Sequence, residues 1–242
     1  MGSSYEQALK TLEKTFKDRI RRPSRESDTK SGALASVLPL HAEEVELLAR
    51  EAARYSMPLA AVGGGTSPEP VAEEGKLLVR FDLMRGVRLP DRDGGWAEAE
   101  PGTPWLKLDE ELRLRDMGLA LYPTSAPRAT VGGWLATDGL GVGSFEFGRL
   151  RENVLSASVV LPGGERREVP GEEVGSFLYR YCRGDRGLRQ APYPPGRCRH
   201  TVRRSLRGRG GHDRRGDRPV RYECAALAPG SPEPGHGARQ KP

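Results

Sequence analysis

Short apolar runs alternate with helical patterns between residues 4 and 181, and this alternation restricts the chain to folds that mix helices with buried strands. Apolar residues with helical spacing predict helices at 4–20, 42–55, 103–118 and 174–181. Apolar or alternating runs predict strands at 59–62, 76–83, 96–100 and 119–122, and a hairpin at 153–169. Thr103 before Pro104 is the expected start of the third helix.

The composition changes abruptly near residue 182. Residues 181–242 hold 15 Lys and Arg against 5 Asp and Glu, whereas the preceding 180 residues have a slight acidic excess. Arg, Gly and Pro fill 32 of these 62 positions. Such a segment buries too little apolar surface to offset its chain entropy. We therefore predict a disordered Arg-rich tail at 182–242, and an N-terminal helix with its linker at 1–35.

Several classes of protein are excluded. Every apolar run is far shorter than the roughly 20 residues that cross a bilayer, and the charged N-terminus lacks the apolar core of a signal peptide. These features predict a cytoplasmic protein without a membrane span. Three cysteines are too few for a disulfide scaffold. The cysteines and histidines lack paired metal-ligand spacing, so no metal is expected.

The first of two glycine-rich segments is Gly63, Gly64, Gly65, Thr66 and Ser67, directly after the apolar run 59–62. Glycines permit positive φ and close approach of the backbone, and successive free N–H groups form a nest for phosphate oxygens. A tight turn without a ligand is the alternative. The segment lacks both the lysine of a P-loop and the GxGxxG spacing.

The second glycine-rich segment runs from residue 130 to residue 148. Five glycines lie between positions 132 and 143, and Trp134, Leu135 and Ala136 interrupt them with residues typical of a core. Taken alone, this segment is read as a glycine-rich loop containing two structural bends. Trp96, Trp105 and Trp134 are expected to pack in the core rather than to stack on a ligand.

The order of these motifs resembles the FAD-binding domain of the vanillyl-alcohol oxidase / para-cresol methylhydroxylase (PCMH) type, and most closely the glycolate oxidase FAD subunit and FAD-linked D-lactate dehydrogenases. The resemblance covers about residues 36–181. It rests on the segments 39–45, 63–67, 78–84, 99–102, 130–137, 147–148, 152–154 and 157–164. The most specific is Thr-Val-Gly-Gly-Trp-Leu-Ala-Thr at 130–137, followed in order by Phe-Gly and Glu-Asn-Val.

The resemblance implies an α+β fold in which FAD lies between two α/β subdomains, at about 36–95 and 96–181. The pyrophosphate would lie on residues 63–67. Further diphosphate and ribityl contacts are expected from Pro123, Thr124, Ser125, Thr130, Val131, Gly132 and Gly133. The isoalloxazine side would be lined by Ala136, Thr137, Gly141, Ser144, Phe147 and Gly148, and the adenosine side from Val154 onward. Thr66 stands where members with covalent flavin often have His, so dissociable FAD is expected.

The resemblance also implies a function. Members oxidise small 2-hydroxy acids or alcohols with hydride transfer to flavin, so a small-molecule substrate is expected and a partner subunit is left open. The catalytic residues stay unassigned, because in the family they come largely from a C-terminal cap domain. Two alternatives remain: a non-catalytic FAD-binding or scaffold module, and a nucleic-acid binder using the Arg-rich tail. The tail has few aromatic residues for base stacking, which disfavours nucleic acid.

The tail also suggests a change of reading frame. In permitted codons, Gly-Asp-Arg-Gly-Leu-Arg at 184–189 can be read one base later as Gly-Thr-Glu-Gly-Phe-Val, which resembles the segment that follows the last helix in the family. We therefore expect a frameshift near residue 183 and a truncated copy of the family protein.

Overall fold

The computed structural model describes residues 2–22, 32–67, 74–89, 96–182 and 220–227. Its helices are α1 (Gly2–Phe16), α2 (Ala42–Arg54), α3 (Trp105–Arg113), α4 (Val131–Ala136), α5 (Ser144–Phe147) and α6 (Gly171–Cys182), with 3-10 turns η1 (Lys17–Arg19) and η2 (Leu150–Asn153). Its strands are β1 (Ile20–Arg21), β2 (Ala35–Val37), β3 (Leu59–Val62), β4 (Leu77–Arg80), β5 (Val87–Arg88), β6 (Glu98–Ala99), β7 (Val154–Val160), β8 (Arg166–Pro170) and β9 (Val220–Leu227).

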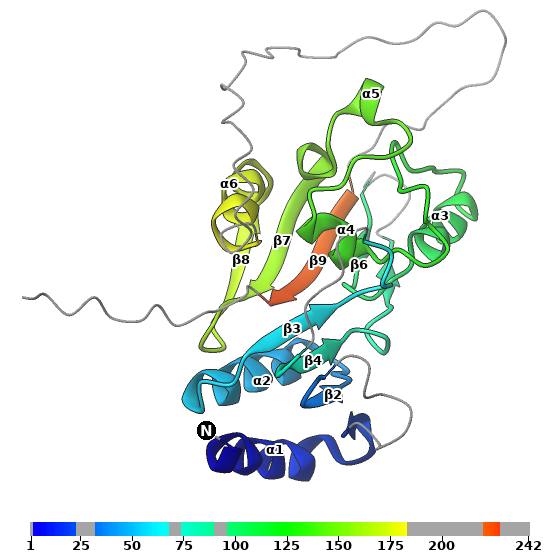
Figure 1. The fold of residues 1–242 in the computed structure, drawn as a ribbon. Coiled ribbons are helices and arrows are strands. Elements are labelled where there is room, and N and C mark those ends of the chain that lie inside the picture. The colour runs from blue at the N-terminus through cyan, green and yellow to red at the C-terminus, as the bar shows by residue number, and fades with distance from the viewer. Residues whose placement is uncertain (1, 23–31, 68–73, 90–95, 183–219, 228–242) are drawn as a thin grey trace, which may run out of the picture.

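The N-terminal part is a four-stranded sheet in the order β1-β2-β4-β3. Strands β2, β4 and β3 are parallel, with Leu59 opposite Leu77 and Val62 opposite Arg80, whereas β1 is antiparallel to β2. The apolar faces of α1 and α2 share one core with these strands, including Leu12, Phe16 and Leu48. The parallel register places the carboxyl ends of β3 and β4 together, so the loops that follow them leave the sheet at one edge (Figure 1).

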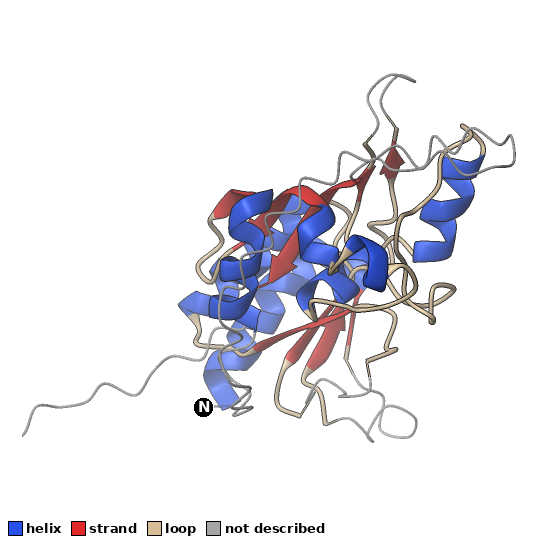
Figure 2. Ribbon diagram, turned by 90° about the horizontal axis from the view of Figure 1, so that it is seen from above, coloured by secondary structure: helices blue, strands red, loops and turns tan. Residues whose placement is uncertain are grey.

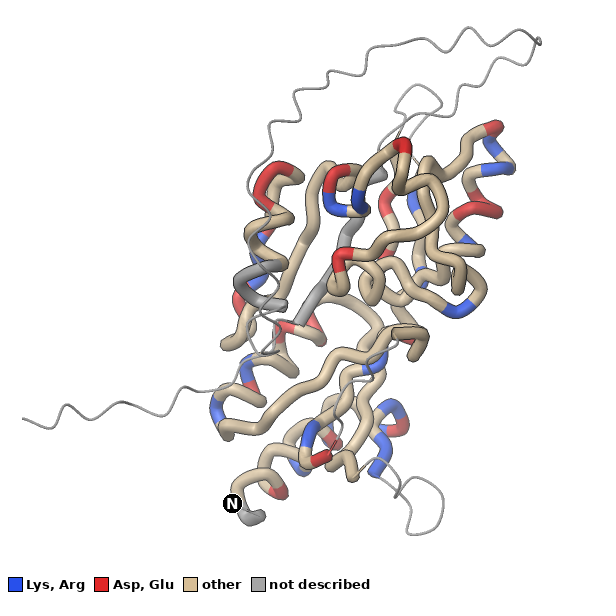
Figure 3. The backbone as a smooth tube through the Cα atoms, turned by 45° about the horizontal axis from the view of Figure 1, so that its top comes forward, with Lys and Arg blue, Asp and Glu red and all other residues tan. Residues whose placement is uncertain are grey.

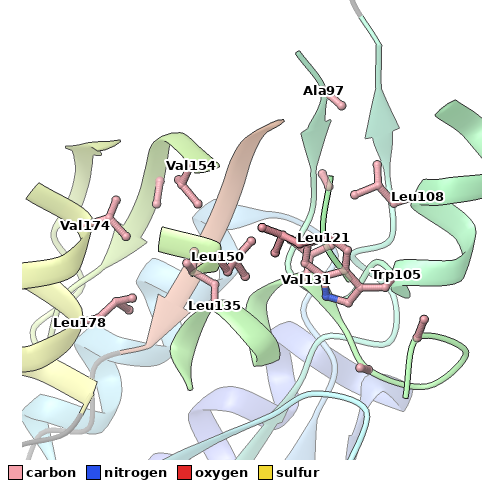
Figure 4. Close-up of a cluster of buried hydrophobic side chains, with 14 of the residues drawn as sticks. Ala97, Trp105, Leu108, Leu121, Val131, Leu135, Leu150, Val154, Val174 and Leu178 are labelled. Carbon is pink, nitrogen blue, oxygen red and sulfur yellow. The ribbon is translucent and has the colours of Figure 1, made fainter. Parts of the chain in front are cut away.

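The C-terminal part contains the β5–β6 ribbon and a second sheet in the order β8-β7-β9. Its core gathers residues from α3, α4, α6 and β7 (Figure 4). Within it, Trp105 and Trp134 meet edge to face with ring centroids 4.9 Å apart. Seen from above, α3 lies at the periphery, away from the other helices (Figure 2). Val160 of β7 belongs to the N-terminal core, so β7 links the two parts.

The structure confirms several predicted elements and corrects others. Helix α2 and strand β3 lie where the sequence predicts them, and β7 with β8 forms the expected hairpin. Pro104 occupies the N-cap position of α3 without a side-chain cap hydrogen bond, so the predicted Thr103 cap is wrong. Thr103 is buried and its hydroxyl donates to the Gly86 carbonyl at 3.0 Å. The interpretation of residues 131–136 as loop is also wrong, because they form α4.

The structure describes eight residues of the predicted tail, Val220–Leu227. Strand β9 lies within the segment predicted to have no regular structure, and it pairs in parallel with β7, with irregular register at two points. Its sequence, Val-Arg-Tyr-Glu-Cys-Ala-Ala-Leu, contains β-forming residues that the average composition of the segment conceals. Residues 183–219 and 228–242, on which the rest of that prediction falls, lie outside the described residues.

Candidate functional site

The two glycine-rich segments, far apart in the sequence, meet backbone to backbone. A Cβ added to Gly63 would lie 2.5 Å from Thr130 Oγ1 and 3.4 Å from the Cα of Gly133. A Cβ added to Gly64 would overlap the carbonyl group of Arg128. Only glycine allows contacts this close, so these two glycines let the loop after β3 close against residues 128–133.

Residues at the start of α4 extend this contact. The Gly132 N–H donates to the Pro101 carbonyl at 2.9 Å, and the Val131 N–H donates to the Thr103 carbonyl at 2.9 Å. A Cβ on Gly132 would lie 2.8 Å from the Cβ of Pro101. The sequence forms a helix here despite two glycines because Thr130 caps it, accepting a hydrogen bond from the Gly133 N–H at 3.2 Å.

The backbone donors of the two segments differ in availability. The N–H groups of Val131, Gly132 and Gly133 are all used by protein oxygens. By contrast, the N–H groups of residues 64–67 donate to no acceptor in the part of the chain that the structure describes. Gly65 has φ +65°, and no described atom lies within 4 Å of its added Cβ. A left-handed residue within a run of free donors is the arrangement of an anion-binding nest.

Residues 123–129 are fixed beside this loop. The turn is closed by the Ala129 N–H, which donates to the Ser125 carbonyl at 2.8 Å. The first N–H groups of α3 also bond to it: Trp105 donates to the Ala129 carbonyl at 3.0 Å, and Leu106 donates to the Ala126 carbonyl at 3.1 Å. Pro123 is buried, Ser125 is half-buried and Thr124 is exposed. The turn thus leaves Thr124 exposed and presents the Arg128 carbonyl to Gly64.

The segment after α4 is held by its own polar groups. The Thr137 hydroxyl donates to the Trp134 carbonyl at 3.0 Å, and the Gly141 N–H donates to Ser144 Oγ at 2.9 Å. The carbonyl of Phe147 accepts from Asn153 Nδ2 at 2.8 Å. Of the predicted contacts in this region, Ala136, Ser144, Phe147 and Gly148 are half-buried and Thr137 is exposed.

Val154 is placed apart from the glycine contact. Its side chain is 5 % exposed and packs in the same core cluster as Val174. Figure 4 shows Val154 on the α6 side of the cluster, away from Val131 and Trp105. The structure therefore brings Gly63, Gly64, Thr130 and Gly133 together but does not bring the Val154 side chain to them.

Sequence reasoning missed a buried carboxylate at the end of α4. The Asp138 side chain is 3 % exposed and lies 3.1 Å from Arg149 Nη1 and 2.7 Å from Arg151 Nη1. The only sequence signal is an Arg-x-Arg pair just before a strand, which does not reveal its acidic partner. Of the three tryptophans, Trp105 is fully buried against Trp134 as predicted, whereas Trp134 and Trp96 are half-buried.

Several charged groups of the described chain are paired with groups of the opposite sign. Basic and acidic residues are interspersed along the described chain (Figure 3), and Asp82, just beyond β4, pairs with Arg80 at 2.9 Å and Arg85 at 3.1 Å. Away from the site, bidentate hydrogen bonds from Arg19 lower the pKa of Glu44. Among the described residues, no three His, Cys, Asp or Glu converge as in a metal site, and no helix is long and apolar enough to cross a membrane.

Comparison with known proteins defines the class. Residues 33–170 match the family model described as FAD binding domain. The chain belongs to this family, which is the PCMH-type FAD-binding domain that the sequence motifs indicated. The described loops and the two hydrophobic cores are thus those of an FAD-binding protein, and its cofactor is FAD.

Individual relatives are flavoenzymes of several kinds. The chain is 34 % identical over 131 residues to the mitochondrial D-lactate dehydrogenase [cytochrome] of Arabidopsis thaliana, covering 53 % of this chain and 23 % of that protein. It is 32 % identical over 174 residues to alkyldihydroxyacetonephosphate synthase of Dictyostelium discoideum, covering 69 % and 28 %. It is 30 % identical over 173 residues to D-2-hydroxyglutarate dehydrogenase of Pseudomonas putida, covering 70 % and 16 %.

Solved structures agree on the fold. An alkyldihydroxyacetonephosphate synthase structure matches with a TM-score of 0.60 at 26 % identity, over 69 % of this chain and 35 % of that chain. A p-cresol methylhydroxylase structure matches with a TM-score of 0.55 at 15 % identity, over 69 % and 36 %, which supports the fold alone. The chain spans less than a third of the length of the three curated relatives named above.

Proposed function

We propose that the protein binds FAD without a covalent link and holds its diphosphate on the N–H groups of residues 64–67. The observation that carries this proposal is the contrast in donors: these N–H groups have no described acceptor, whereas those of Val131, Gly132 and Gly133 are already used. The left-handed φ of Gly65 and the open space around it fit an approaching phosphate. Thr66 cannot form the histidyl link, so the flavin is dissociable.

The ring end of FAD is proposed to lie beside the segment that follows α4. The six residues of α4 span about 9 Å, and its two ends separate the glycine contact from Asp138. The ribityl chain of FAD bridges a gap of this kind between diphosphate and isoalloxazine. Residues 136–148 then orient the ring. When bound, FAD supplies a two-electron acceptor for a substrate hydride, and the protein supplies binding and orientation.

The reaction proposed for the whole protein is oxidation of a small 2-hydroxy acid or alcohol. Two of the relatives are named for 2-hydroxy acids, D-lactate and D-2-hydroxyglutarate. No described residue is assigned as catalytic, because none of the site geometry identifies a group that would face such a substrate. A module that binds FAD without turnover is the competing outcome of the experiment that follows.

The test is a titration of the purified chain with FAD. Binding is measured by calorimetry and by the change in the visible flavin spectrum. Acid precipitation should then release all the flavin into the supernatant; yellow colour in the pellet would contradict the non-covalent link. Anaerobic addition of D-lactate, glycolate or D-2-hydroxyglutarate should bleach the bound flavin if the chain is catalytic. FAD binding without bleaching by any hydroxy acid or alcohol would favour the non-catalytic module, and absence of FAD binding would refute the proposal.

A further inference from the structure

The loop at residues 139–148 is fixed to the domain along its length. A Cβ on Gly139 would overlap the indole of Trp134, so the loop lies directly on that ring. Tyr122 and Val142 exchange two backbone hydrogen bonds, of 3.1 and 2.9 Å. Gly143 has φ +86°, and a Cβ there would overlap the Ala120 carbonyl. The loop therefore has one backbone path, imposed by contacts that tolerate no added atoms.

The same loop contains large apolar side chains that are exposed in the structure. Leu140 is 58 % exposed, Val142 is 47 % exposed and Phe145 is fully exposed. Exposing three large apolar side chains within one short stretch of chain is unfavourable in water. A fixed loop that keeps them exposed therefore offers an apolar surface that a flat, mostly apolar ring can cover.

The start of this loop depends on Asp138. Asp138 has φ +50°, a left-handed conformation that is unfavourable for most non-glycine residues and that Asp adopts when its short polar side chain is held locally. Its carboxylate is ion-paired with Arg149 and Arg151, and Arg149 Nη1 also lies 3.4 Å from the Asp138 carbonyl oxygen. The two arginines flank Leu150 in η2, whose side chain is fully buried. The ion pairs thus tie the strained turn to a segment anchored in the core.

We propose that Asp138, Arg149 and Arg151 form a positioning lock that sets the affinity for the ring end of FAD; this rests on the proposed function. Without the Asp138 charge, the guanidinium groups of Arg149 and Arg151, whose side chains are 34 % and 36 % exposed, lose their shared acidic partner and repel each other. The left-handed turn then loses its compensation, and residues 139–148 leave the position that contacts the ring. The nest at residues 64–67 lies at the other end of α4 and keeps its geometry.

The experiment compares FAD with ADP, which carries the adenosine and diphosphate of FAD but lacks the ribityl chain and the ring. Calorimetry gives the dissociation constants of both ligands for the unmodified chain and for Asp138→Asn, which keeps the side-chain shape and removes the charge. Arg149→Gln is the milder variant, because it leaves the 2.7 Å pair with Arg151 in place. Arg166→Gln is the control, since it removes a half-exposed arginine paired with Glu43 and Glu46 instead.

The expected result is a selective loss. Asp138→Asn should weaken FAD binding at least tenfold and change ADP binding less than twofold, with a smaller selective loss for Arg149→Gln and none for Arg166→Gln. The visible band of bound flavin should also change shape in the first two variants. Equal weakening of FAD and ADP, or no weakening of either, would overturn the lock while leaving FAD binding intact. If Asp138→Asn does not fold, Arg149→Gln decides between these outcomes alone. An unmodified chain that binds neither ligand would refute the proposed function and the lock together.

Discussion

The loop after β3 and the first turn of α4 both contain consecutive glycines, but the backbone N–H groups of the two segments have different partners. At Gly132 and Gly133 the N–H groups bond to Pro101 and Thr130, and the missing side chains make room for neighbouring atoms. At Gly65 there is room to spare and the neighbouring N–H groups have no described acceptor. Consecutive glycines therefore indicate a ligand site only where their backbone N–H groups have no hydrogen-bond acceptor within the described protein.

The loop after β3 contains one glycine of each kind. Gly64 packs against the Arg128 carbonyl, whereas Gly65 stands in the open with a left-handed φ. Substitutions at neighbouring positions should consequently fail for different reasons. The variants below separate failure of packing from failure of binding, in decreasing order of their expected effect on stability.

Gly64→Val should give the largest loss of folding stability. The new side chain would overlap the Arg128 carbonyl, and backbone on both sides leaves no flexible group to move. Overpacking of this kind costs at least about 3 kcal/mol when the neighbour cannot yield, which lowers the Tm by roughly 10 °C for a domain of this size. The change in Tm is measured by thermal unfolding of the FAD-free protein, monitored by circular dichroism.

Gly118→Val is the control for this variant, because no described atom lies within 4 Å of its added Cβ and its φ is not left-handed. A Gly64→Val protein as stable as this control would show that the loop after β3 does not close against residues 128–133. The packing role assigned to Gly64 would then be wrong.

Gly132→Ala should lower the stability by an intermediate amount, although glycine-to-alanine changes in helices usually raise it. Alanine in place of glycine inside a helix normally stabilises it by about 1 kcal/mol. Here the added methyl would press on Pro101, with contacts of 2.8 Å to Cβ and 3.0 Å to Cα and to the carbonyl oxygen. We expect a net destabilisation of about 1–2 kcal/mol, measured by urea unfolding of the FAD-free protein.

The matched control is Gly118→Ala, which should be neutral or stabilising by up to about 1 kcal/mol. The folded fraction of Gly132→Ala should retain FAD, because the Gly132 N–H bonds to Pro101 rather than to a ligand. A stabilised Gly132→Ala protein that had lost its FAD would reverse the roles assigned to the two glycine pairs.

Local patterns account for what the sequence predicted well. Helix α2 has one apolar face and glutamates in its first turn, and β3 is an apolar run ended by glycines, so neighbouring residues suffice to predict both. The loop at 63–67 was predicted for the same reason, together with the motif order of the family.

Tertiary contacts explain what the sequence concealed. Two glycines oppose a helix at 131–136, and it forms because Thr130 caps it and carbonyls from Pro101 and Thr103 accept its first N–H groups. The Asp138 ion pairs depend on the fold of η2 over the turn, which no spacing reveals. That the N–H groups of residues 64–67 have no acceptor among the described residues likewise follows only from the hydrogen bonds of the folded structure.

Gly65→Val should have the smallest effect on stability and the most specific effect on binding. A β-branched residue at φ +65° costs about 1–2 kcal/mol, but it clashes with no described atom. Gly75→Val is the matched control: Gly75 has φ +68° and equally open surroundings, and its N–H donates to the Gly32 carbonyl at 2.8 Å. Both variants should lose similar stability in urea unfolding. Only Gly65→Val should also weaken FAD binding, by about tenfold, which corresponds to about 1.4 kcal/mol, because strain that turns the Gly65 backbone redirects the free N–H groups. Equal FAD affinity in the two variants would show that the open loop is an ordinary turn, and the difference between the two glycine pairs would then concern packing alone.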